Sequence, residues 1–225
     1  ARARSAPDPN VVLERIEGLI AELADADVAA IGIGVPGRVD FPTRRVLSGG
    51  YVDLSRVPLA SHIEQRFGRP VVIDNDCAMA LVAEAALGAA REARSVAMLT
   101  IGTGIGGAVM DGGKILRGHL SAGQLGHISV DPSGLPCLCG KRGCLETVSS
   151  GTSLGRHIRQ ASLPADTRAI DLLARAEAGD SVAAAVLDAW ARPLRTAIDD
   201  LVATLDPDLV VLGGGLGQEA CAAVA

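Results

Sequence analysis

Residues 127–146 read HISVDPSGLPCLCGKRGCLE, and this stretch decides more about the fold than any other part of the chain. It brings together one imidazole and three thiols, a ligand set that suits tetrahedral zinc. The candidate ligands are His127, Cys137, Cys139 and Cys144. The glycines and prolines among them supply the tight turns that short-range ligands need to converge on one point. Glu146 follows the last cysteine by two positions, so a carboxylate lies beside the cluster.

A disulfide-stapled loop and reduced cysteines packed as small apolar residues are the alternatives to a zinc site. The chain has five cysteines, an odd number, and no signal peptide precedes them, so nothing supports an oxidising compartment. A C-x-C pair with a third cysteine nearby and a histidine upstream favours zinc. The other two cysteines, Cys77 and Cys221, are expected to be buried thiols.

The bulk composition indicates a compact soluble protein. Apolar residues make up 48% of the 225 positions and charged residues 21%, which excludes a disordered chain. Aromatic residues are only 2%, so Ala, Val, Leu and Ile must build the core. A net charge of −5 argues against a general nucleic-acid surface. Apolar stretches are too short for a membrane helix, and we expect a cytoplasmic location.

Strand and helix patterns alternate along the chain, which predicts an α/β protein. The helices are expected at 11–23 with Asn10 as N-cap, and at 59–67, 77–90, 152–160, 167–178 and 181–204 with Asp180 as N-cap. The strands are expected at 28–35, 71–74, 96–101, 105–110 and 210–212. The stretch after Gly37 reads as loop-rich and the cysteine segment as irregular. A domain boundary near Arg94 is expected because each half has its own strands and helices.

Asp74, Asn75 and Asp76 follow a buried strand and precede a helix. Ligands bind at the carboxyl ends of strands in open α/β sheets, and a carboxylate there can act as a general base toward a substrate hydroxyl. Helix capping by Asn75 or Asp76 explains the same residues without any catalysis. The triplet alone leaves both interpretations open.

A glycine-rich stretch, LTIGTGIGGAV, places Gly102, Gly104 and Gly107 at G-x-G-x-x-G spacing. A dinucleotide fingerprint must open a helix, but the residues that follow read as a strand, so a Rossmann site is disfavoured. A hairpin whose small residues let backbone amides and Thr103 approach a polyphosphate fits better. A plain glycine turn is the alternative. The run 213–215 after a strand leaves the same choice open.

Taken in order, several segments resemble the ROK family of sugar kinases and sugar-responsive repressors. The segments are IGIGVPGRVD, VVIDNDCAMA, LTIGTGIGGAV, GQLGHISVDPSGLPCLCGKRGCLE and LVVLGGGL. The resemblance implies the actin-like (RNase H-like) α/β fold, with two lobes closing on a cleft. Residues 1–94 would be a partial small lobe, and residues 95–225 would be the large lobe with the zinc-binding loop.

The resemblance also implies an ATP-dependent hexose kinase of the glucokinase type and a role for each matching residue. Asp76 would be the catalytic base, and the sugar-binding positions would be Asn75, Gln124, His127 and Glu146. The hairpin would face the phosphates of ATP through Gly102, Thr103, Gly104 and Gly106, and the adenosine would lie near Gly213, Gly214 and Gly215. Mg²⁺ would neutralise the phosphates, and structural Zn²⁺ would be held by His127, Cys137, Cys139 and Cys144. A homodimer is implied as well.

Two departures from the family pattern limit this expectation. The family's usual glutamate in its E-x-G-H segment is Gln124, which loses the charge and adds a donor. The family's N-terminal D-x-G-x-T phosphate motif has no counterpart, and the chain stops soon after GGGLGQ. We therefore expect part of a longer protein, or a truncated form that lacks the first strands of the small lobe and the C-terminal helices. A ROK-type repressor with its DNA-binding domain elsewhere and a non-catalytic, zinc-stabilised sugar-binding protein are the alternatives.

Overall fold

The computed structural model describes residues 5–49 and 52–224 and divides the chain into two compact units. Unit 1 comprises residues 1–80 together with 119–121, and unit 2 comprises residues 81–118 and 122–225. The lobe boundary near Arg94 stays a prediction.

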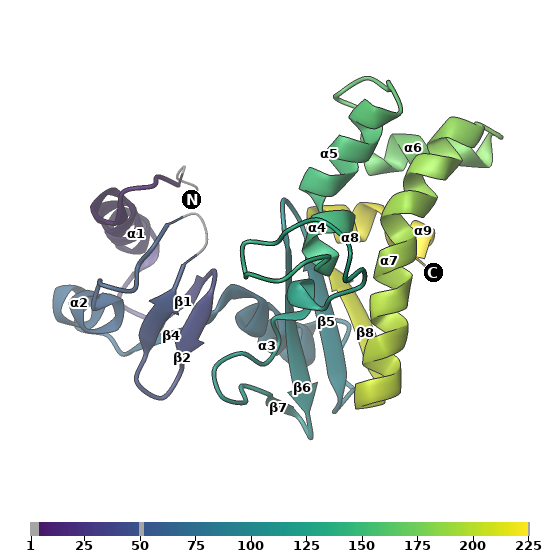
Figure 1. The fold of residues 1–225 in the computed structure, drawn as a ribbon. Coiled ribbons are helices and arrows are strands. Elements are labelled where there is room, and N and C mark those ends of the chain that lie inside the picture. The colour runs from purple at the N-terminus through teal and green to yellow at the C-terminus, as the bar shows by residue number, and fades with distance from the viewer. Residues whose placement is uncertain (1–4, 50–51, 225) are drawn as a thin grey trace. The chain divides into compact units, whose positions relative to one another are not determined.

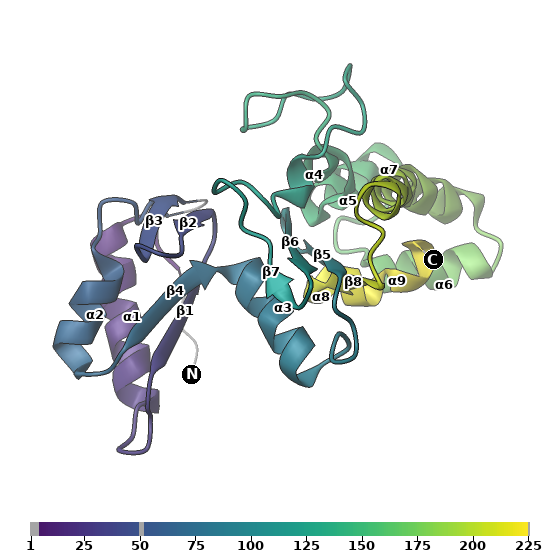
Figure 2. The same ribbon diagram turned by 90° about the horizontal axis from the view of Figure 1, so that it is seen from below.

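Unit 1 is built on a pair of parallel strands with two helices packed on one face (Figures 1 and 2). Its elements are α1 (Pro9–Leu23), β1 (Ile31–Val35), β2 (Arg38–Asp40), β3 (Arg45–Ser48), α2 (Leu59–Phe67), β4 (Val71–Asn75) and the start of α3 (Asp76–Leu87). β1 pairs with β4 in parallel, and the two strands end together at Val35 and Asn75. Consecutive residues at the carboxyl end of this pair are therefore presented at one edge, where α3 begins.

The unit 1 core is aliphatic, as the composition predicts. Ile63 and Ile73 are fully buried, and Val71 and Leu59 are nearly so. The apolar residues of α1 that recur at helical spacing pack against this cluster, which explains why the period-3.6 pattern predicted the helix correctly. Its N-cap is Asp8, whose carboxylate accepts from the Asn10 amide at 2.8 Å, so the prediction of Asn10 as the cap is wrong.

A β-hairpin occupies part of the segment that the sequence marked as loop-rich. β2 and β3 are antiparallel, with a register irregularity beside Val39. Val39 and Val46 are buried while their neighbours are not. Alternation over so few residues is too weak a signal to predict a strand.

Unit 2 contains a four-stranded sheet in the order β7-β6-β5-β8. Its elements after α3 are β5 (Val96–Ile101), β6 (Ile105–Asp111), β7 (Lys114–Ile115), the 3-10 helix η1 (Leu125–His127), α4 (Leu145–Ser149), α5 (Gly151–Gln160), α6 (Ala169–Glu177), α7 (Ser181–Leu205), β8 (Leu209–Gly213), α8 (Gly214–Glu219) and α9 (Cys221–Val224). β5 is antiparallel to β6 and parallel to β8.

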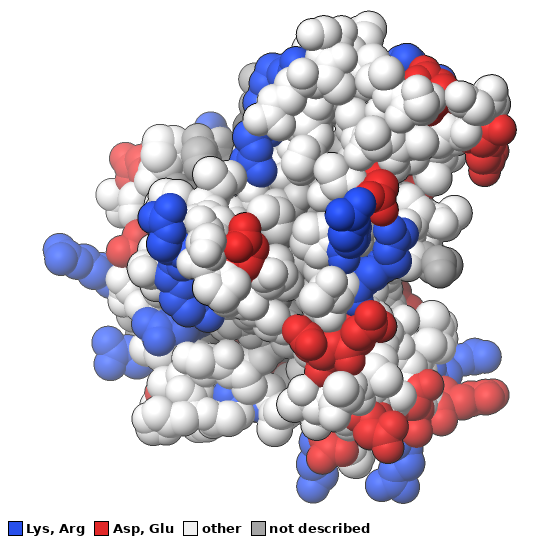
Figure 3. All heavy atoms as spheres, turned by 45° about the vertical axis from the view of Figure 1, so that its right-hand side comes forward, with Lys and Arg blue, Asp and Glu red and all other residues white. Residues whose placement is uncertain are grey.

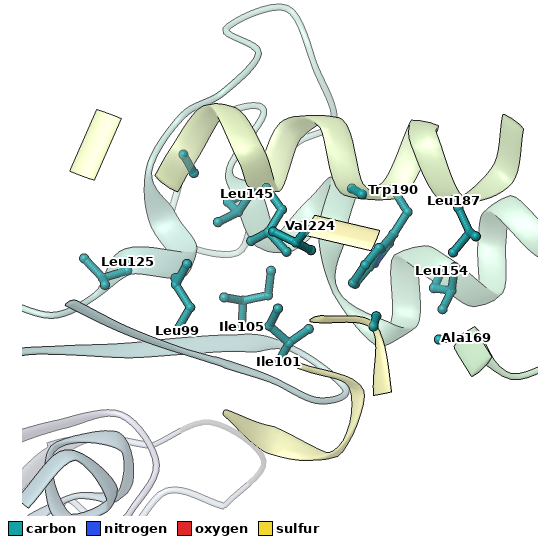
Figure 4. Packing of buried hydrophobic residues seen from close by; sticks show 14 of the residues in the cluster. Leu99, Ile101, Ile105, Leu125, Leu145, Leu154, Ala169, Leu187, Trp190 and Val224 are labelled. Atoms are coloured by element: carbon teal, nitrogen blue, oxygen red, sulfur yellow. The ribbon is translucent and has the colours of Figure 1, made fainter. Parts of the chain in front are cut away.

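The long helix α7 lies along one face of the sheet, and the core of unit 2 fills the space between them (Figure 4). Leu99, Ile101 and Ile105 point up from β5 and β6 toward Leu145 and Trp190. Trp190, the one tryptophan of the sequence, is fully buried, and its indole N–H donates to the Ser150 carbonyl at 3.1 Å. This bond ties the core helix to the junction between α4 and α5.

Several short elements of unit 2 were not predicted. η1 and α4 flank the cysteine segment, β7 extends the sheet, and α8 and α9 follow β8. Cys77 is buried as expected, whereas Cys221 is exposed, so that expectation is wrong. Cys221 opens the four-residue helix α9, which packs Val224 into the core and leaves Cys221 exposed.

Basic and acidic side chains lie interspersed on the face drawn in Figure 3. Ion pairs in unit 2 include Arg175 with Asp180 at 2.6 Å and Arg195 with Asp188 at 2.9 Å. Among the described residues, no helix is both long enough and apolar enough to cross a bilayer.

Candidate functional site

Asn75 and Asp76 lie where β4 meets α3, at the carboxyl end of the parallel pair in unit 1. Asp74 before them is 6% exposed, Asn75 is half-buried and Asp76 is exposed. Exposure to solvent increases from Asp74 to Asp76, so the Asp76 carboxylate is the one that solvent or a substrate can reach. Of the two carboxylates in the triplet, Asp76 is therefore the exposed one.

Asn75 is held from both ends of its amide. Its Oδ1 accepts from the amides of Cys77 at 2.9 Å and Ala78 at 3.1 Å, and its Nδ2 donates to the Gly37 carbonyl at 2.9 Å. A side-chain amide has two donor hydrogens, so one N–H is left over. The capping interpretation of Asn75 is confirmed, and it is compatible with one further hydrogen bond to a ligand.

Asp76 also takes part in the start of α3. Its Oδ1 accepts from the Cys77 amide at 2.9 Å, an interaction that fixes the carboxylate relative to the helix. A carboxylate has acceptor positions on both oxygens, so this bond leaves capacity for a substrate hydroxyl. Capping and a chemical role are therefore not exclusive at this position.

The four predicted metal ligands converge in unit 2. The ligand atoms of His127, Cys137, Cys139 and Cys144 all lie within 4.8 Å of one another. The His127 Nδ1 lies 3.6 Å from the Cys137 Sγ, and the Sγ atoms of Cys139 and Cys144 are 3.5 Å apart. Tetrahedral zinc with ordinary Zn–S and Zn–N bonds requires ligand separations of roughly 3.5–3.8 Å. Two ligand pairs lie at about this separation and the others within 4.8 Å, so the residue types and their convergence suit zinc, and the cysteines are free rather than disulfide-bonded.

The pKa values of two of these thiols are shifted by their surroundings. A hydrogen bond from the Lys141 backbone lowers the pKa of Cys139. Burial raises the pKa of Cys144 to about 12, with further increases from the neighbouring sulfurs. Burial among the other sulfurs therefore favours the protonated form of the Cys144 thiol when no cation lies beside it.

Tight turns hold the cysteine segment in place. The Cys137 amide donates to the Lys141 carbonyl at 2.8 Å, and the Gly140 amide donates to the Cys137 carbonyl at 3.0 Å. Gly140 and Gly143 have φ of 88° and 62°, the left-handed region that favours glycine. A Cβ on Gly143 would also overlap the Asp131 carbonyl oxygen. The glycines noted in the sequence are therefore required by the backbone.

Gln124 directly precedes η1, and His127 is the last residue of this helix. Gln124 precedes the helix and accepts from the His127 amide through its carbonyl at 3.0 Å, and both side chains are half-buried. His127 turns Nδ1 toward Cys137, which leaves Nε2 as the ring atom available to a ligand. One imidazole can thus serve a metal and a substrate at once.

Glu146 connects the cysteine segment to the glycine hairpin. It stands in the first turn of α4, two residues after Cys144, and its Oε2 accepts from the Ile105 amide at 2.9 Å. A Cβ on Gly104 would lie against the same oxygen. Sequence reasoning placed Glu146 near the metal, and the structure adds that its carboxylate also contacts the start of β6.

The β5–β6 hairpin has the predicted form. Ile101 pairs with Ile105, and Gly107 lies inside β6 rather than opening a helix, so the prediction against a Rossmann fingerprint is confirmed. Gly106, another predicted phosphate-binding position, pairs with Thr100 within the strands. The connecting turn consists of residues 102–104, and the Gly102 amide donates to the Gly104 carbonyl at 3.0 Å.

The predicted nucleotide-binding glycines differ in what surrounds them. A Cβ on Gly102 or Gly215 would meet nothing within 4 Å. A Cβ on Gly213 would lie 2.7 Å from the Met98 Cε, and Gly214 has a φ of 79° with the Ile101 carbonyl oxygen in the way. Gly213 and Gly214 are therefore explained by the protein itself. Gly102 and Gly215 leave open space beside the backbone, and the protein itself does not require glycine there.

Sequence reasoning missed two residues that organise these positions. Gly37 holds Asn75, and Thr152 in the first turn of α5 contacts the hairpin turn through its amide and its hydroxyl. Pro36-Gly37 was identified as a turn and 152–160 as a helix, so both residues were visible. Their partners lie 38 and 49 positions away, and no local signal connects them.

The chain is similar to known proteins along most of its length. A glucokinase from Halalkalibacterium halodurans is 35% identical over 208 residues, which make up 86% of this chain and 63% of that protein. The chain thus spans a little under two thirds of that relative. A solved ROK family glucokinase from Streptomyces griseus, in complex with glucose and AMPPNP, has a TM-score of 0.83 at 32% identity and covers 96% of this chain and 75% of its own.

A second branch of the family is equally recognisable in the structure. A ROK family transcriptional regulator, a homologue of the E. coli MLC protein, has a TM-score of 0.81 at 29% identity over 96% of this chain and 57% of its own. The ROK family model itself matches residues 2–222. From these matches and the α/β architecture described above, the chain belongs to the ROK family and has its actin-like fold.

Proposed function

We propose that the protein transfers the γ-phosphoryl group of ATP to a hydroxyl of a hexose. The observation that carries this proposal is Asp76, an exposed carboxylate fixed at the carboxyl end of a buried parallel strand pair. A pure binding protein has no need of a base at this position. Asp76 would accept the proton of the attacking hydroxyl, and Asn75 would donate its remaining N–H to the sugar.

We assign sugar recognition in unit 2 to His127, Glu146 and Gln124. His127 would present Nε2 to a hydroxyl, and Glu146 would use the oxygen that does not accept from Ile105. His127 and Glu146 are each held in position by a protein partner, which lowers the entropy lost on binding. The identity of the sugar depends on Gln124, where the family's usual carboxylate is replaced by an amide.

Zinc would be held by His127, Cys137, Cys139 and Cys144, and its contribution would be structural. The convergence of one imidazole and three thiols, with ligand atoms within 4.8 Å of one another, supports this choice of metal. The ion would fix the His127 ring so that Nε2 points at the substrate. Phosphoryl transfer would not pass through it.

The nucleotide would lie against the open sides of Gly102 and Gly215, where added side chains would meet no protein atom. The Thr103 and Gly104 amides would donate to the phosphates. Mg²⁺ bound to ATP would supply charge neutralisation, as in other phosphoryl transfers. A homodimer is the predicted assembly of the intact protein.

Replacing the proposed base tests the proposal. Asp76→Asn retains the capping oxygen and the shape of the side chain but cannot accept a proton, so kcat should fall by about 10²–10⁴ while the protein stays folded. Asp180→Asn is the matched control, because Asp180 also accepts from amides at a helix start, at 2.9 and 3.1 Å, but stands at α7. Turnover of Asp76→Asn equal to that of the control would reject the role of Asp76.

A sugar-responsive repressor is the second candidate, and the similarity to the transcriptional regulator favours it. The same sugar-binding residues would then act as a sensor, with a DNA-binding part elsewhere in the intact protein. The two candidates differ in one readout. A repressor binds the sugar and leaves ATP intact, whereas a kinase produces ADP and a sugar phosphate in equal amounts.

A further inference from the structure

The first turn of α5 donates hydrogen bonds to two consecutive peptide groups in the turn of the β5–β6 hairpin. The Gly151 amide donates to the Gly102 carbonyl at 2.8 Å. Thr152 donates to the Thr103 carbonyl twice, from its amide at 3.2 Å and from its Oγ1 at 2.8 Å. These three bonds all use carbonyl oxygens of the hairpin turn.

A trans peptide group points its C=O and its N–H in opposite directions. Holding the Gly102 and Thr103 carbonyls against α5 therefore turns the amides of Thr103 and Gly104 away from that helix. In the described part of the chain these two amides have no acceptor, whereas the amides on either side are occupied by the Gly104 carbonyl and by Glu146. Two successive free donors with one orientation form an anion-binding arrangement.

The hairpin turn depends on these hydrogen bonds because it is rich in glycine. Thr103 stands between two glycines, and glycine adopts many backbone conformations at little cost. Without an external contact the Thr103–Gly104 peptide group can rotate and withdraw its N–H. Gly151 contributes to the close approach as well, because a Cβ there would lie 2.6 Å from the Gly102 carbonyl oxygen.

We infer that Thr152 is a positioning residue that orients the Thr103 and Gly104 amides toward the phosphates of the nucleotide. The inference rests on the proposed function insofar as the ligand is a nucleoside triphosphate. Thr152 acts through the hairpin and does not itself contact the ligand. Its hydroxyl is the part that a substitution can remove without changing the shape of the side chain.

The test measures binding of AMPPNP and of glucose by calorimetry to the intact protein and its variants. Thr152→Val removes the hydroxyl and should weaken AMPPNP binding about five- to tenfold, while glucose affinity stays within about twofold. Thr152→Ser restores the hydroxyl and should recover AMPPNP binding. Thr204→Val is the control, because the exposed Thr204 hydroxyl also donates to a main-chain carbonyl, that of Asp200 at 2.6 Å. Thr152→Ala replaces Thr152→Val if the latter does not fold.

The outcomes separate this inference from the proposed function. Unchanged AMPPNP affinity in Thr152→Val, an equal loss for both ligands, or no recovery in Thr152→Ser would overturn the role of Thr152. A wild-type protein that binds AMPPNP but transfers no phosphoryl group would reject the kinase proposal and leave the positioning role standing. A wild-type protein that binds no AMPPNP would overturn both.

Discussion

Gly102 and Gly104 stand two positions apart in one turn, yet they are glycine for different reasons. A Cβ on Gly104 would meet the Glu146 carboxylate, so this glycine makes room for another side chain of the protein. A Cβ on Gly102 would point into open space, and its φ lies outside the left-handed region. The fold itself therefore tolerates alanine at Gly102, and only a ligand that approaches closely would exclude it.

Gly102→Ala should leave the protein folded and weaken ATP binding by at least about tenfold, because the methyl group fills the space of a phosphate. Gly18→Ala is the matched control, since its Cβ also meets nothing within 4 Å but lies on α1. Calorimetry with AMPPNP measures both variants. Equal affinity in the two would contradict a nucleotide beside Gly102.

Gln124→Glu restores the charge that the family pattern has at this position. A hydrogen bond to a carboxylate is stronger than one to a neutral amide by about 1 kcal/mol, so sugar affinity should rise about fivefold. Gln160→Glu on the exposed end of α5 controls for added charge. A panel of hexoses and their N-acetylated forms in steady-state kinetics reads both affinity and preference. No change for any sugar would remove Gln124 from the recognition site.

At the scale of elements, backbone hydrogen bonds and the converging side chains together shape the loop between η1 and α4. Isolated bridges join Ser129 with Cys144 and Pro136 with Arg142, and the Val130 amide donates to the Gly143 carbonyl at 2.9 Å. Three of the four proposed zinc ligands lie in or at the end of this loop. The ion would therefore add a cross-link between the ends of this loop to the backbone hydrogen bonds it already has.

Chelation of the metal should consequently loosen this loop and cost sugar affinity, because His127 loses the contact that orients its ring. Hydrogen exchange should speed up over residues 129–144, while the amides of β5 and β6 keep their protection. Metal analysis should find one zinc per chain before chelation. Unchanged exchange and sugar affinity after complete zinc removal would contradict this role.

The sequence predicted the long elements because each has a periodic apolar face that packs on a core. α7 was predicted within one residue at its end, despite Pro193 inside it. α1 was predicted but its cap was not, because Asp8 and Asn10 are both good caps. Pro9 at the first helical position was the signal that distinguishes them. The short strands β2 and β3 have too few residues for a readable alternation.

In the candidate site, too, features formed by residues close together in the sequence could be predicted, and contacts between distant residues could not. The metal ligands were predictable because the chain itself brings them within eighteen positions, and the ligand chemistry is specific. The hydrogen bonds between Glu146 and Ile105 and between Thr152 and Thr103 join residues 41 and 49 positions apart. Such contacts arise from tertiary packing and leave no local pattern in the sequence.

At the scale of the whole molecule, acid should destabilise the protein in two windows. Burial lowers the pKa of His157 below its ordinary 6.5, so the folded protein holds this imidazole neutral while the unfolded chain protonates it. Backbone amides lower the pKa of Asp208, Asp180 and Glu64 below the ordinary values of 3.8 and 4.5. In both cases the unfolded state binds more protons, so stability falls as pH falls.

Urea denaturation followed by Trp190 fluorescence should show the fall in stability in both pH windows. Trp190 lies in the core of unit 2, and His157 lies on α5 of the same unit. The midpoint should be constant above about pH 7, decline below 6.5, and decline further below about 4. His157→Gln should remove the first decline and leave the second. A first decline of equal size in that variant would show that another group is responsible.

The central claim is that an exposed Asp76 makes this ROK chain a sugar kinase, and phosphorus NMR of the intact protein with ATP, Mg²⁺ and a hexose panel tests it most directly. The account predicts ADP and a sugar monophosphate appearing in equal amounts with at least one hexose, and loss of both signals in Asp76→Asn. A protein that binds a hexose while ATP persists unchanged, or an Asp76→Asn variant that turns over like the wild type, would contradict it.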